Sequence, residues 1–321
     1  MNAMRYISRR LLGGVLLLAG VSILSFSLST LVPGNYFDEM RLNPQVSAET
    51  LAQLRSQYGI DQPLTNRYFH WLEYSLRGDF GFSFAYNMPV SSLIWSRCRN
   101  TLLLAASATL LVWIIAVPLG IVAAARQGWL DRSISLGTSF LLSVPEIAII
   151  LALLALAVST GVVPVSGIGV PSEALTRWSQ AKDLALRMAI PTLALTLVGL
   201  PIVLQHTRTA IKEVLEAPFI RSAQGHGIGP LRLLLRHALP AAANPLISLL
   251  GLSIAGLIGT SLLAEVVSGW PGLGPLFVQS IFARDLYVVI AIVMLSSLFL
   301  VIGNLLGDVL LCVADPRIRT E

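Results

Sequence analysis

Long apolar segments alternate with shorter polar ones along the whole chain. Six apolar segments stand out, and they cover residues 11–31, 100–125, 134–160, 186–206, 245–266 and 287–312. Each is about 20 residues long or longer, which is the length that an α-helix needs to cross the hydrocarbon core of a bilayer. The pattern therefore predicts an all-α integral membrane protein with six transmembrane helices. Pro118 and Pro145 lie inside two of these segments and are expected to kink them.

The amino-acid composition agrees with a membrane protein. Charged residues make up 12% of the 321 residues, against about 25% in soluble domains, and the mean hydropathy is +0.75. The net charge of +5 comes from arginines scattered near the ends of apolar segments, so it does not indicate a nucleic-acid partner. The first apolar segment follows Arg5, Arg9 and Arg10. A cleaved signal peptide is the alternative there, but the length of the segment favours a retained helix.

The longest polar region covers residues 32–99. Ser47 can cap one helix that ends at Gly59, and Pro63 can open a second helix that ends at Gly78. The region is too long and too regularly patterned for a linker. We therefore expect a helical extracytoplasmic region between the first and second transmembrane helices.

The distribution of Lys and Arg gives the expected orientation. With both termini in the cytoplasm, twelve of these residues lie inside and ten outside, and six of the ten belong to residues 32–99. Long loops cross the membrane largely regardless of their charge, so residues 32–99 are set aside. The remaining Lys and Arg residues, twelve inside and four outside, decide the orientation. The expected divisions of the chain are a cytoplasmic N-terminus with the first helix (1–31), the extracytoplasmic region (32–99), a core of five helices (100–313) with a cytoplasmic loop (207–244), and a cytoplasmic tail (314–321).

A polar, basic segment at residues 217–240 interrupts the apolar second half of the chain. It contains three arginines, two histidines and no acid, and by the positive-inside rule it belongs in the cytoplasm. We expect two short helices with a glycine break at Gly225, Gly227 and Gly229, and Pro230 in the first turn of the second helix. An ordinary basic loop is the alternative interpretation. On the second helix an apolar stripe is expected at Leu231, Leu234, Leu235 and Ala238.

The sequence contains none of the catalytic motifs that would make the chain an enzyme. There is no Gly-Lys dipeptide, so the phosphate-binding loop of ATPases is absent, and no His-Glu-x-x-His, Gly-x-Ser-x-Gly or Cys-x-x-Cys sequence occurs. We therefore expect no catalytic residue, no metal site and no cofactor. Glu146, next to Pro145, is an acid inside an apolar segment, and such acids usually face protein or water. A place on a translocation path is one interpretation of this pair, and local packing is the other.

Several motifs resemble those of binding-protein-dependent ABC importer permeases. Ala223, Gly227 and the ending His-Ala-Leu-Pro at 237–240 are similar to the cytoplasmic coupling loop of that family, although Arg221-Ser222-Ala223 stands in place of its usual Glu-Ala-Ala opening. Residues 58–83 resemble the extracytoplasmic segment of the B-type subunit of dipeptide, oligopeptide and nickel permeases.

The resemblance implies a fold, a location and a set of partners. The fold is a MetI-like ABC importer permease fold with six transmembrane helices, in the bacterial inner membrane. The implied partners are a second homologous permease subunit that forms a heterodimer, two cytoplasmic ATP-binding subunits, an extracytoplasmic substrate-binding protein and the lipid bilayer. The implied residues of the ATPase-coupling loop are Ala217, Phe219, Arg221, Ala223, Gly227, His237 and Pro240.

The resemblance leaves the substrate open. Di- or oligopeptides are expected, and nickel or a metal chelate is the alternative, because these branches share the motifs. A secondary transporter that uses an ion gradient through Glu146 or Asp308 is a further alternative, but the inverted repeat typical of such proteins is not evident. An intramembrane enzyme or sensor would need paired catalytic groups, and His206 has no evident partner in the sequence.

Overall fold

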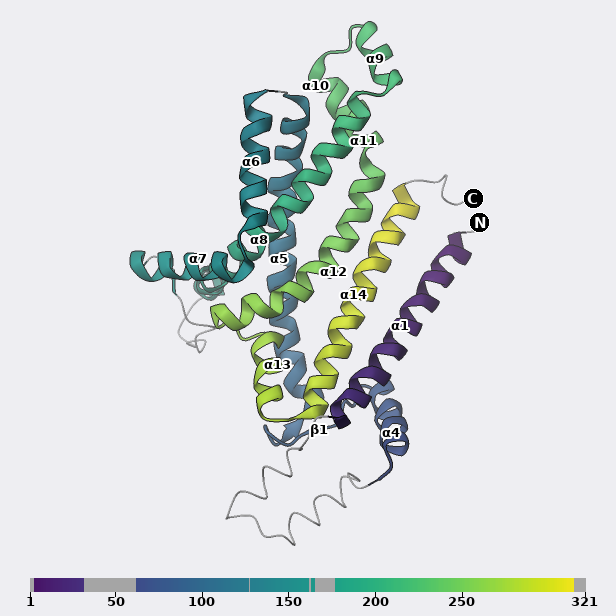
Figure 1. Cartoon of the computed structure of the whole chain (residues 1–321), viewed down its shortest axis with the longest axis vertical. Helices are drawn as coiled ribbons and strands as arrows, with labels where there is room; N and C mark the ends of the chain where they lie inside the picture. The colour runs from purple at the N-terminus through teal and green to yellow at the C-terminus, as the bar shows by residue number, and fades with distance from the viewer. Residues whose placement is uncertain (1–2, 32–61, 127, 162, 165–176, 315–321) are drawn as a thin grey trace. The chain divides into compact units, whose positions relative to one another are not determined.

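The computed structural model describes residues 3–31, 62–126, 128–161, 163–164 and 177–314, which are mostly helical (Figure 1). The chain divides into two compact units. Unit 1 comprises Met1–Leu11, Leu102–Trp270 and Leu300–Glu321, and unit 2 comprises Leu12–Thr101 and Pro271–Phe299. Three helices contribute residues to both units: α1 (Ala3–Leu31), α5 (Val90–Ala125) and α14 (Leu286–Ala314).

Five helices of the described chain are long and apolar enough to cross a membrane. They are α1, α5, α8 (Arg177–Leu215), α12 (Ala243–Ser268) and α14. A sixth candidate span consists of two helices that meet the same criteria as a pair, α6 (Trp129–Ser143) and α7 (Glu146–Thr160). The prediction of an all-α membrane protein is confirmed, and its six spans are reached when this pair counts as one.

The apolar segment 134–160, expected as one span kinked at Pro145, forms two separate helices rather than a kinked one. α6 ends at Ser143, Val144 is extended (φ −89°, ψ 125°), and α7 begins after Pro145 at an angle of 99° to α6. Proline disfavours the helical conformation in the residue before it and lacks the N–H that would continue the hydrogen-bond ladder. Pro145 therefore breaks the helix, and Figure 1 shows α7 turned across the direction of α6. By contrast, α5 continues through Pro118.

The core of unit 1 is built from α5, α7, α8 and α12. Its central cluster of buried residues contains Leu104, Ala108, Ile150, Met188, Ala194, Leu195, Ala264 and Trp270. Trp270, which is 1% exposed, follows the end of α12. A second cluster joins α5, α8 and α12 through Val112, Val203 and Leu249. The two clusters fix the positions of the three long helices in unit 1.

α12 and α14 contact each other through small residues in unit 1. A Cβ added at Gly251 would lie 2.8 Å from the Gly307 Cα and 3.0 Å from the Gly303 carbonyl oxygen. A Cβ added at Gly303 would lie 3.1 Å from the backbone nitrogen of Ala255. Small residues spaced four apart let the backbones of membrane helices approach closely. The Gly-x-x-x-Gly spacing is therefore the sequence signal of this contact.

Among the described residues between α1 and α5, unit 2 contains one short helix and a β-hairpin. α4 (Leu64–Leu76) confirms the helix predicted after Pro63, and Gly78 follows its end with φ 84°. The helix predicted from Ser47 lies outside the described residues. The hairpin pairs β1 (Phe82–Ser83) with β2 (Met88–Pro89) in antiparallel fashion, and it was not predicted. The unit also contains α13 (Leu273–Phe282).

Asp285 attaches this hairpin to the residues that precede α14. The Ser83 hydroxyl donates a hydrogen bond to Asp285 Oδ2 at 2.6 Å, and the Ala85 N–H donates to the same oxygen at 3.2 Å. Asp285 is only 1% exposed. Burial raises the pKa of this carboxyl, although the hydrogen bonds from Ser83 and from nearby backbone N–H groups act in the opposite direction.

Candidate functional site

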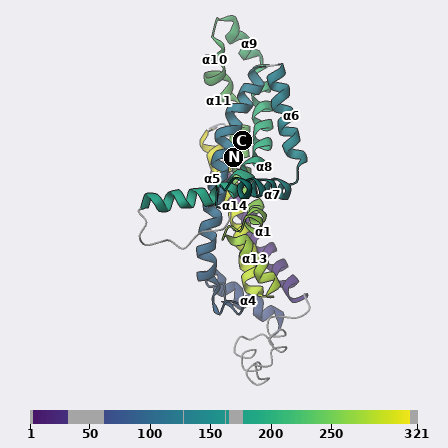
Figure 2. The same cartoon turned by 90° about the vertical axis from the view of Figure 1, so that its left-hand side faces the viewer.

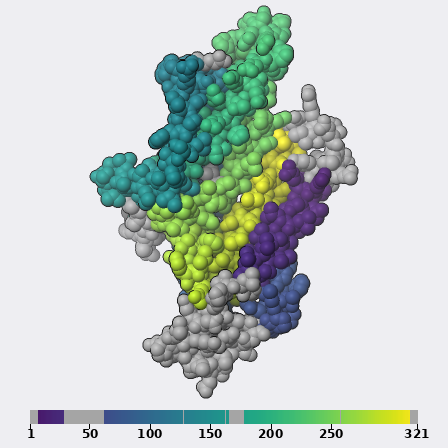
Figure 3. Space-filling view, viewed as in Figure 1, coloured from purple at the N-terminus to yellow at the C-terminus, as the bar shows by residue number. Residues whose placement is uncertain are grey.

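The basic segment 217–240 continues directly from α8, at the end of unit 1 where α8 ends and α12 begins (Figures 1 and 2). Ala217 is extended (φ −68°, ψ 146°) and occupies the N-cap position of α9 (Pro218–Gly225), whose first residue is proline. The chain then forms, in order, α10 (Pro230–Leu233), a π-helical turn (Leu234–Ala238) and α11 (Leu239–Ala241). Two short helices with a glycine break are present as predicted, and Figure 3 shows them projecting from unit 1.

The basic segment is folded onto the end of α8. Ile220 (0% exposed), Leu233 (4%) and Ala238 (0%) form a buried cluster. Val214 and Leu215, which belong to the last turn of α8, pack against this cluster. Fully burying a side chain such as that of Ile220 stabilises the fold by about 1.5–3 kcal/mol. Because α9 and the end of α8 share one small core, a force on α9 acts on α8.

The glycine break is a regular helix termination. Gly227 has φ 76°, a left-handed conformation that glycine adopts without steric cost. The Gly227 N–H donates to the Gln224 carbonyl at 2.9 Å, and the Ile228 N–H donates to the Ala223 carbonyl at 3.4 Å. These are the two hydrogen bonds of a Schellman motif. Gly227 therefore fixes the direction in which the chain leaves α9.

The outer surface of the basic segment combines apolar and positively charged side chains. Phe219 is 52% exposed, and it lies on α9 with the exposed Arg221. On the second part of the segment Arg232 and Arg236 are exposed. No acidic residue occurs in residues 217–240. The surface can therefore pair with a partner that offers an apolar groove and acidic side chains.

The apolar stripe expected on the second helix is partly wrong. Leu231 is 70% exposed and Leu235 is 53% exposed, whereas Leu233 is buried. Leu231 and Leu233 lie on α10, before the π-helical turn at Leu234–Ala238, so the departure from the expected stripe begins on α10 itself. Ala238 is buried as expected.

The structure places the seven predicted coupling residues along this segment. Phe219, Arg221, Gly227 and Pro240 are exposed, and Ala217, Ala223 and His237 are half-buried. The first five positions in the chain belong to α9 and its two ends, whereas His237 lies in the π-helical turn and Pro240 in α11. The predicted residues are therefore brought together on one folded element.

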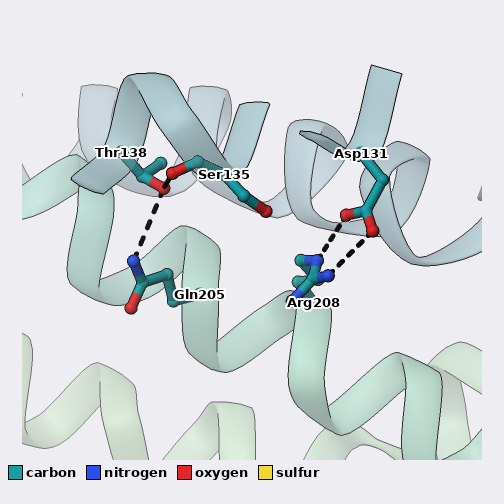
Figure 4. Close-up of polar contacts among 5 residues, drawn as sticks. All are labelled: Asp131, Ser135, Thr138, Gln205 and Arg208. Carbon is teal, nitrogen blue, oxygen red and sulfur yellow. Dashed lines mark hydrogen bonds and ion pairs between the residues drawn. The ribbon is translucent and has the colours of Figure 1, made fainter. Parts of the chain in front are cut away.

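Two polar contacts join α6 to α8 (Figure 4). The Arg208 guanidinium donates through Nε to Asp131 Oδ1 at 2.5 Å and through Nη2 to Oδ2 at 2.8 Å. The Gln205 amide donates to the Thr138 hydroxyl at 3.4 Å. A two-point arginine–carboxylate contact fixes orientation as well as distance. Neither contact was predicted, since the partners lie 77 and 67 residues apart in the chain.

α5 holds the same stretch of α8 from another side. A Cβ added at Gly120 would lie 2.8 Å from the Thr207 Cβ and 3.0 Å from the Leu204 carbonyl oxygen. Thr207 is fully buried, and its hydroxyl donates to the Val203 carbonyl at 2.8 Å. The stretch of α8 that leads into the basic segment is therefore fixed by close packing on α5 and by the ion pair with α6.

An apolar pocket of about 320 Å³ lies on α5, α8 and α12. Its lining includes Ile202 and His206 from α8 and Leu252, Gly256 and Thr260 from α12. Ile202 is 48% exposed and Leu252 is 61% exposed. Among the described residues that line the pocket, His206 alone is ionisable.

The predicted path residues form the corner between α6 and α7. Pro145 is exposed and Glu146 is half-buried in the first turn of α7. Glu146 Oε1 is buried and has no hydrogen-bond partner among the described residues. Sequence reading missed a second acid, Glu265 in α12, which is fully buried. The sequence marks Glu265 as the single acid within the apolar segment 245–266. In the part of the chain that the structure describes, no group of three or more His, Cys, Asp or Glu side chains is arranged to hold a metal ion.

The apolar spans and the folded basic segment at the end of α8 are those of a multi-pass membrane protein. Residues 116–320 match the family described as binding-protein-dependent transport system inner membrane component, and residues 3–105 match the N-terminal model of the same kind of protein. This chain belongs to that family. It is a permease subunit of an ABC importer and a multi-pass protein of the inner membrane.

Curated relatives cover nearly the whole chain. It is 35% identical over 318 residues to the oligopeptide transport system permease protein AppB of Bacillus subtilis (strain 168), with 98% of this chain and 99% of the relative covered. It is 32% identical over 321 residues to the glutathione transport system permease protein GsiC of Escherichia coli (strain K12), with the same coverage. The family membership decides against the secondary-transporter and intramembrane-enzyme alternatives.

A solved structure supports the fold. An inward-facing form of the MetNI methionine ABC transporter matches with a TM-score of 0.53 at 19% identity, and the match covers 70% of this chain and 96% of that chain. The prediction of a MetI-like permease fold is therefore confirmed. At this identity the likeness concerns the fold alone.

Proposed function

We propose that this chain forms part of the translocation pathway for di- or oligopeptides and is driven by cytoplasmic ATPases through the basic segment 217–240. Two relatives of the chain support a peptide cargo. An oligopeptide permease and a permease for glutathione, itself a tripeptide, are each about one-third identical to this chain. The expected companions are a second homologous permease subunit, two ATP-binding subunits and an extracytoplasmic substrate-binding protein.

We propose an orientation with both termini and the basic segment in the cytoplasm. The excess of Lys and Arg on that side, once the long region 32–99 is set aside, supports it. In this orientation α4 and the hairpin lie outside the membrane. The seven coupling residues then face the compartment in which ATP is hydrolysed.

One observation carries the coupling role: the basic segment is an exposed surface built on the end of a membrane-spanning helix. Phe219 and Arg221 are exposed, while Ile220 is anchored on Val214 and Leu215 of α8. An ATPase that binds this surface unequally in its two states shifts the equilibrium of α8 by that difference in affinity. The ion pair with α6 and the close packing on α5 extend the movement to those helices.

The proposed pathway uses the exposed faces of α8 and α12 together with the α6–α7 corner. The pocket that contains His206 offers an apolar surface with few polar groups, which suits cargo that must not bind too tightly. Pro145 and Glu146 are included because Glu146 is half-buried and its Oε1 has no partner among the described residues. Such an acid is costly inside a membrane unless it faces water or cargo.

The experiment is a charge substitution at the glycine break. Gly227→Asp is expected to leave the protein in the membrane but to uncouple ATP hydrolysis from peptide uptake, because it disturbs the left-handed turn that directs α9. Gly229→Asp is the matched control, since Gly229 has φ −62° and caps α10, a position where aspartate is preferred. Normal uptake per ATP by the Gly227 variant in the reconstituted complex would count against the assignment. If both variants uncouple ATP hydrolysis from uptake equally, the cause is the added charge and not the disturbed turn at Gly227.

A further inference from the structure

Unit 2 contains a pocket that the proposed function does not use. Its volume is about 360 Å³, near the lower end of the range of about 300–1,000 Å³ found for small-molecule sites. α4 contributes Arg67, Trp71 and Tyr74 to its lining, β1 contributes Phe82, and the first turn of α14 contributes Tyr287. The size and the mixed lining are those of a site for a small amphipathic molecule.

Two hydrogen-bond donors in this lining have no acceptor among the residues that the structure describes. Trp71 is 5% exposed, and its Nε1 is buried without a hydrogen-bond partner among the described residues. The same holds for Nε of Arg67, which lies one helical turn earlier on α4. The Arg67 guanidinium also lies 5.9 Å from the centre of the Phe26 ring, which restrains it. Because a buried donor without an acceptor is costly, a ligand with carboxylate oxygens gains from both groups.

The rest of the pocket offers aromatic surface and one carboxylate. The rings of His70 and Tyr74, which line it, stack with centroids 6.3 Å apart and an angle of 16° between their planes. Asp79 is exposed at the pocket, and its Oδ1 accepts a hydrogen bond from the Gly81 N–H at 3.0 Å. A ligand with a carboxylate, an ammonium group and an apolar side chain matches all three features.

We propose that this pocket binds a short zwitterionic peptide, with its carboxylate at Arg67 and Trp71, its ammonium group at Asp79 and a side chain against the aromatic rings. The proposal rests on the proposed function, which supplies peptides as the cargo. In the proposed orientation the pocket lies at the extracytoplasmic end of α14, on the side from which cargo arrives. The permease itself then contributes to peptide selection before translocation.

The test uses the full chain in lipid nanodiscs, without the substrate-binding protein or the ATPases. Binding of radiolabelled Ala-Phe is measured by equilibrium dialysis and compared with binding of Ala-Phe amide, which lacks the carboxylate. The variants are Arg67→Lys, which keeps the charge but removes the planar fork, and Trp71→Phe, which keeps the ring but removes the N–H. Arg77→Lys is the matched control, because Arg77 is 69% exposed in an ion pair with Glu73 and does not line the pocket.

The expected result is saturable binding of Ala-Phe that is at least tenfold weaker for the amide and at least tenfold weaker in each pocket variant, with the control unchanged. Three results overturn the proposal: no binding of Ala-Phe, equal binding of the amide, or binding of Ala-Phe by both pocket variants that equals that of the wild type. The comparison of acid with amide needs no variant, so it holds even if Trp71→Phe fails to fold. ATP-driven peptide uptake by the complete system separates the two ideas, since uptake without binding here refutes only the pocket.

Discussion

The contact between Arg208 and Asp131 gives a prediction whose size follows from its geometry. The pair has two hydrogen bonds, and the two side chains are 28% and 21% exposed. Exposed pairs contribute about 0–1 kcal/mol, whereas removing one partner of a fully buried pair costs about 3–5 kcal/mol. For a pair between these limits we expect each of Arg208→Gln and Asp131→Asn to cost about 2 kcal/mol. The two variants together should cost about 1–2 kcal/mol less than the sum of the single changes.

The assay is a double-mutant cycle on the free energy of unfolding in mixed detergent micelles. The control cycle uses Glu73 on α4 and Arg77, the residue after the end of α4. Arg77 Nη2 lies 2.8 Å from Glu73 Oε1, and the two side chains are 69% (Arg77) and 58% (Glu73) exposed. That pair is expected to show a coupling energy of about 0.5 kcal/mol or less. Because α8 leads into the basic segment, the Arg208 variant should also lower the amount of peptide taken up per ATP hydrolysed.

A coupling energy no larger than that of the control pair would refute the reasoning. It would mean that α6 and α8 are held together by apolar packing and that the two-point contact adds nothing. A large coupling energy with unchanged uptake per ATP would mean that the ion pair stabilises the fold but does not pass the movement of α8 to α6. The helix that moves with α8 would then be α5.

Three further predictions concern glycine packing and one buried acid. Gly251→Ala should destabilise the protein by about 1–3 kcal/mol, because the added Cβ meets the backbone of α14. Gly259→Ala on the same helix has open space around it, so it should be neutral or stabilise the protein by up to about 1 kcal/mol. Thermal unfolding of both variants measures the difference. Gly227→Ala should cost about 1–2 kcal/mol through its positive φ, measured as lower resistance of the basic segment to proteolysis. Burial raises the pKa of Asp285 in the folded state, so the stability of the wild type should rise as the pH falls through that pKa. Asp285→Asn should remove this pH dependence, and an unchanged pH profile would contradict the cause given for the shift.

Much of the fold could be predicted because membrane helices have a simple signal. Runs of about 20 apolar residues identified the long helices. The glycine break at Gly225, Gly227 and Gly229 identified two short helices in residues 217–240. The break at Pro145 could not be predicted in the same way. Hydropathy is high on both sides of that proline, and a proline in such a run is compatible with a kink, as at Pro118, or with two separate helices. Only the packing of α7 decides between them.

The contacts between distant residues lay outside what the sequence could show. The Ser83–Asp285 bond joins residues 202 positions apart, and no local pattern marks such a pair. The hairpin that carries Ser83 had one signal, Asn87, which adopts φ 50° in its turn. In the basic segment the π-helical turn at Leu234–Ala238 could not be predicted, because sequence periodicity assumes a regular helix. The individual coupling residues stay predictions, since nothing in the structure tests what they bind.

The prolines inside α8 bear on how far the basic segment can travel. α8 runs through Pro191 and Pro201 before it reaches Leu215, and a helix rises about 1.5 Å per residue, so the part after Pro201 extends about 21 Å. A rotation of this part of α8 by about 10° at Pro201, where one backbone hydrogen bond is already missing, would move Leu215 by about 4 Å. A modest angular change near the middle of one helix is thus enough to shift the whole of α9 by roughly the spacing of neighbouring side chains, with no helix having to melt.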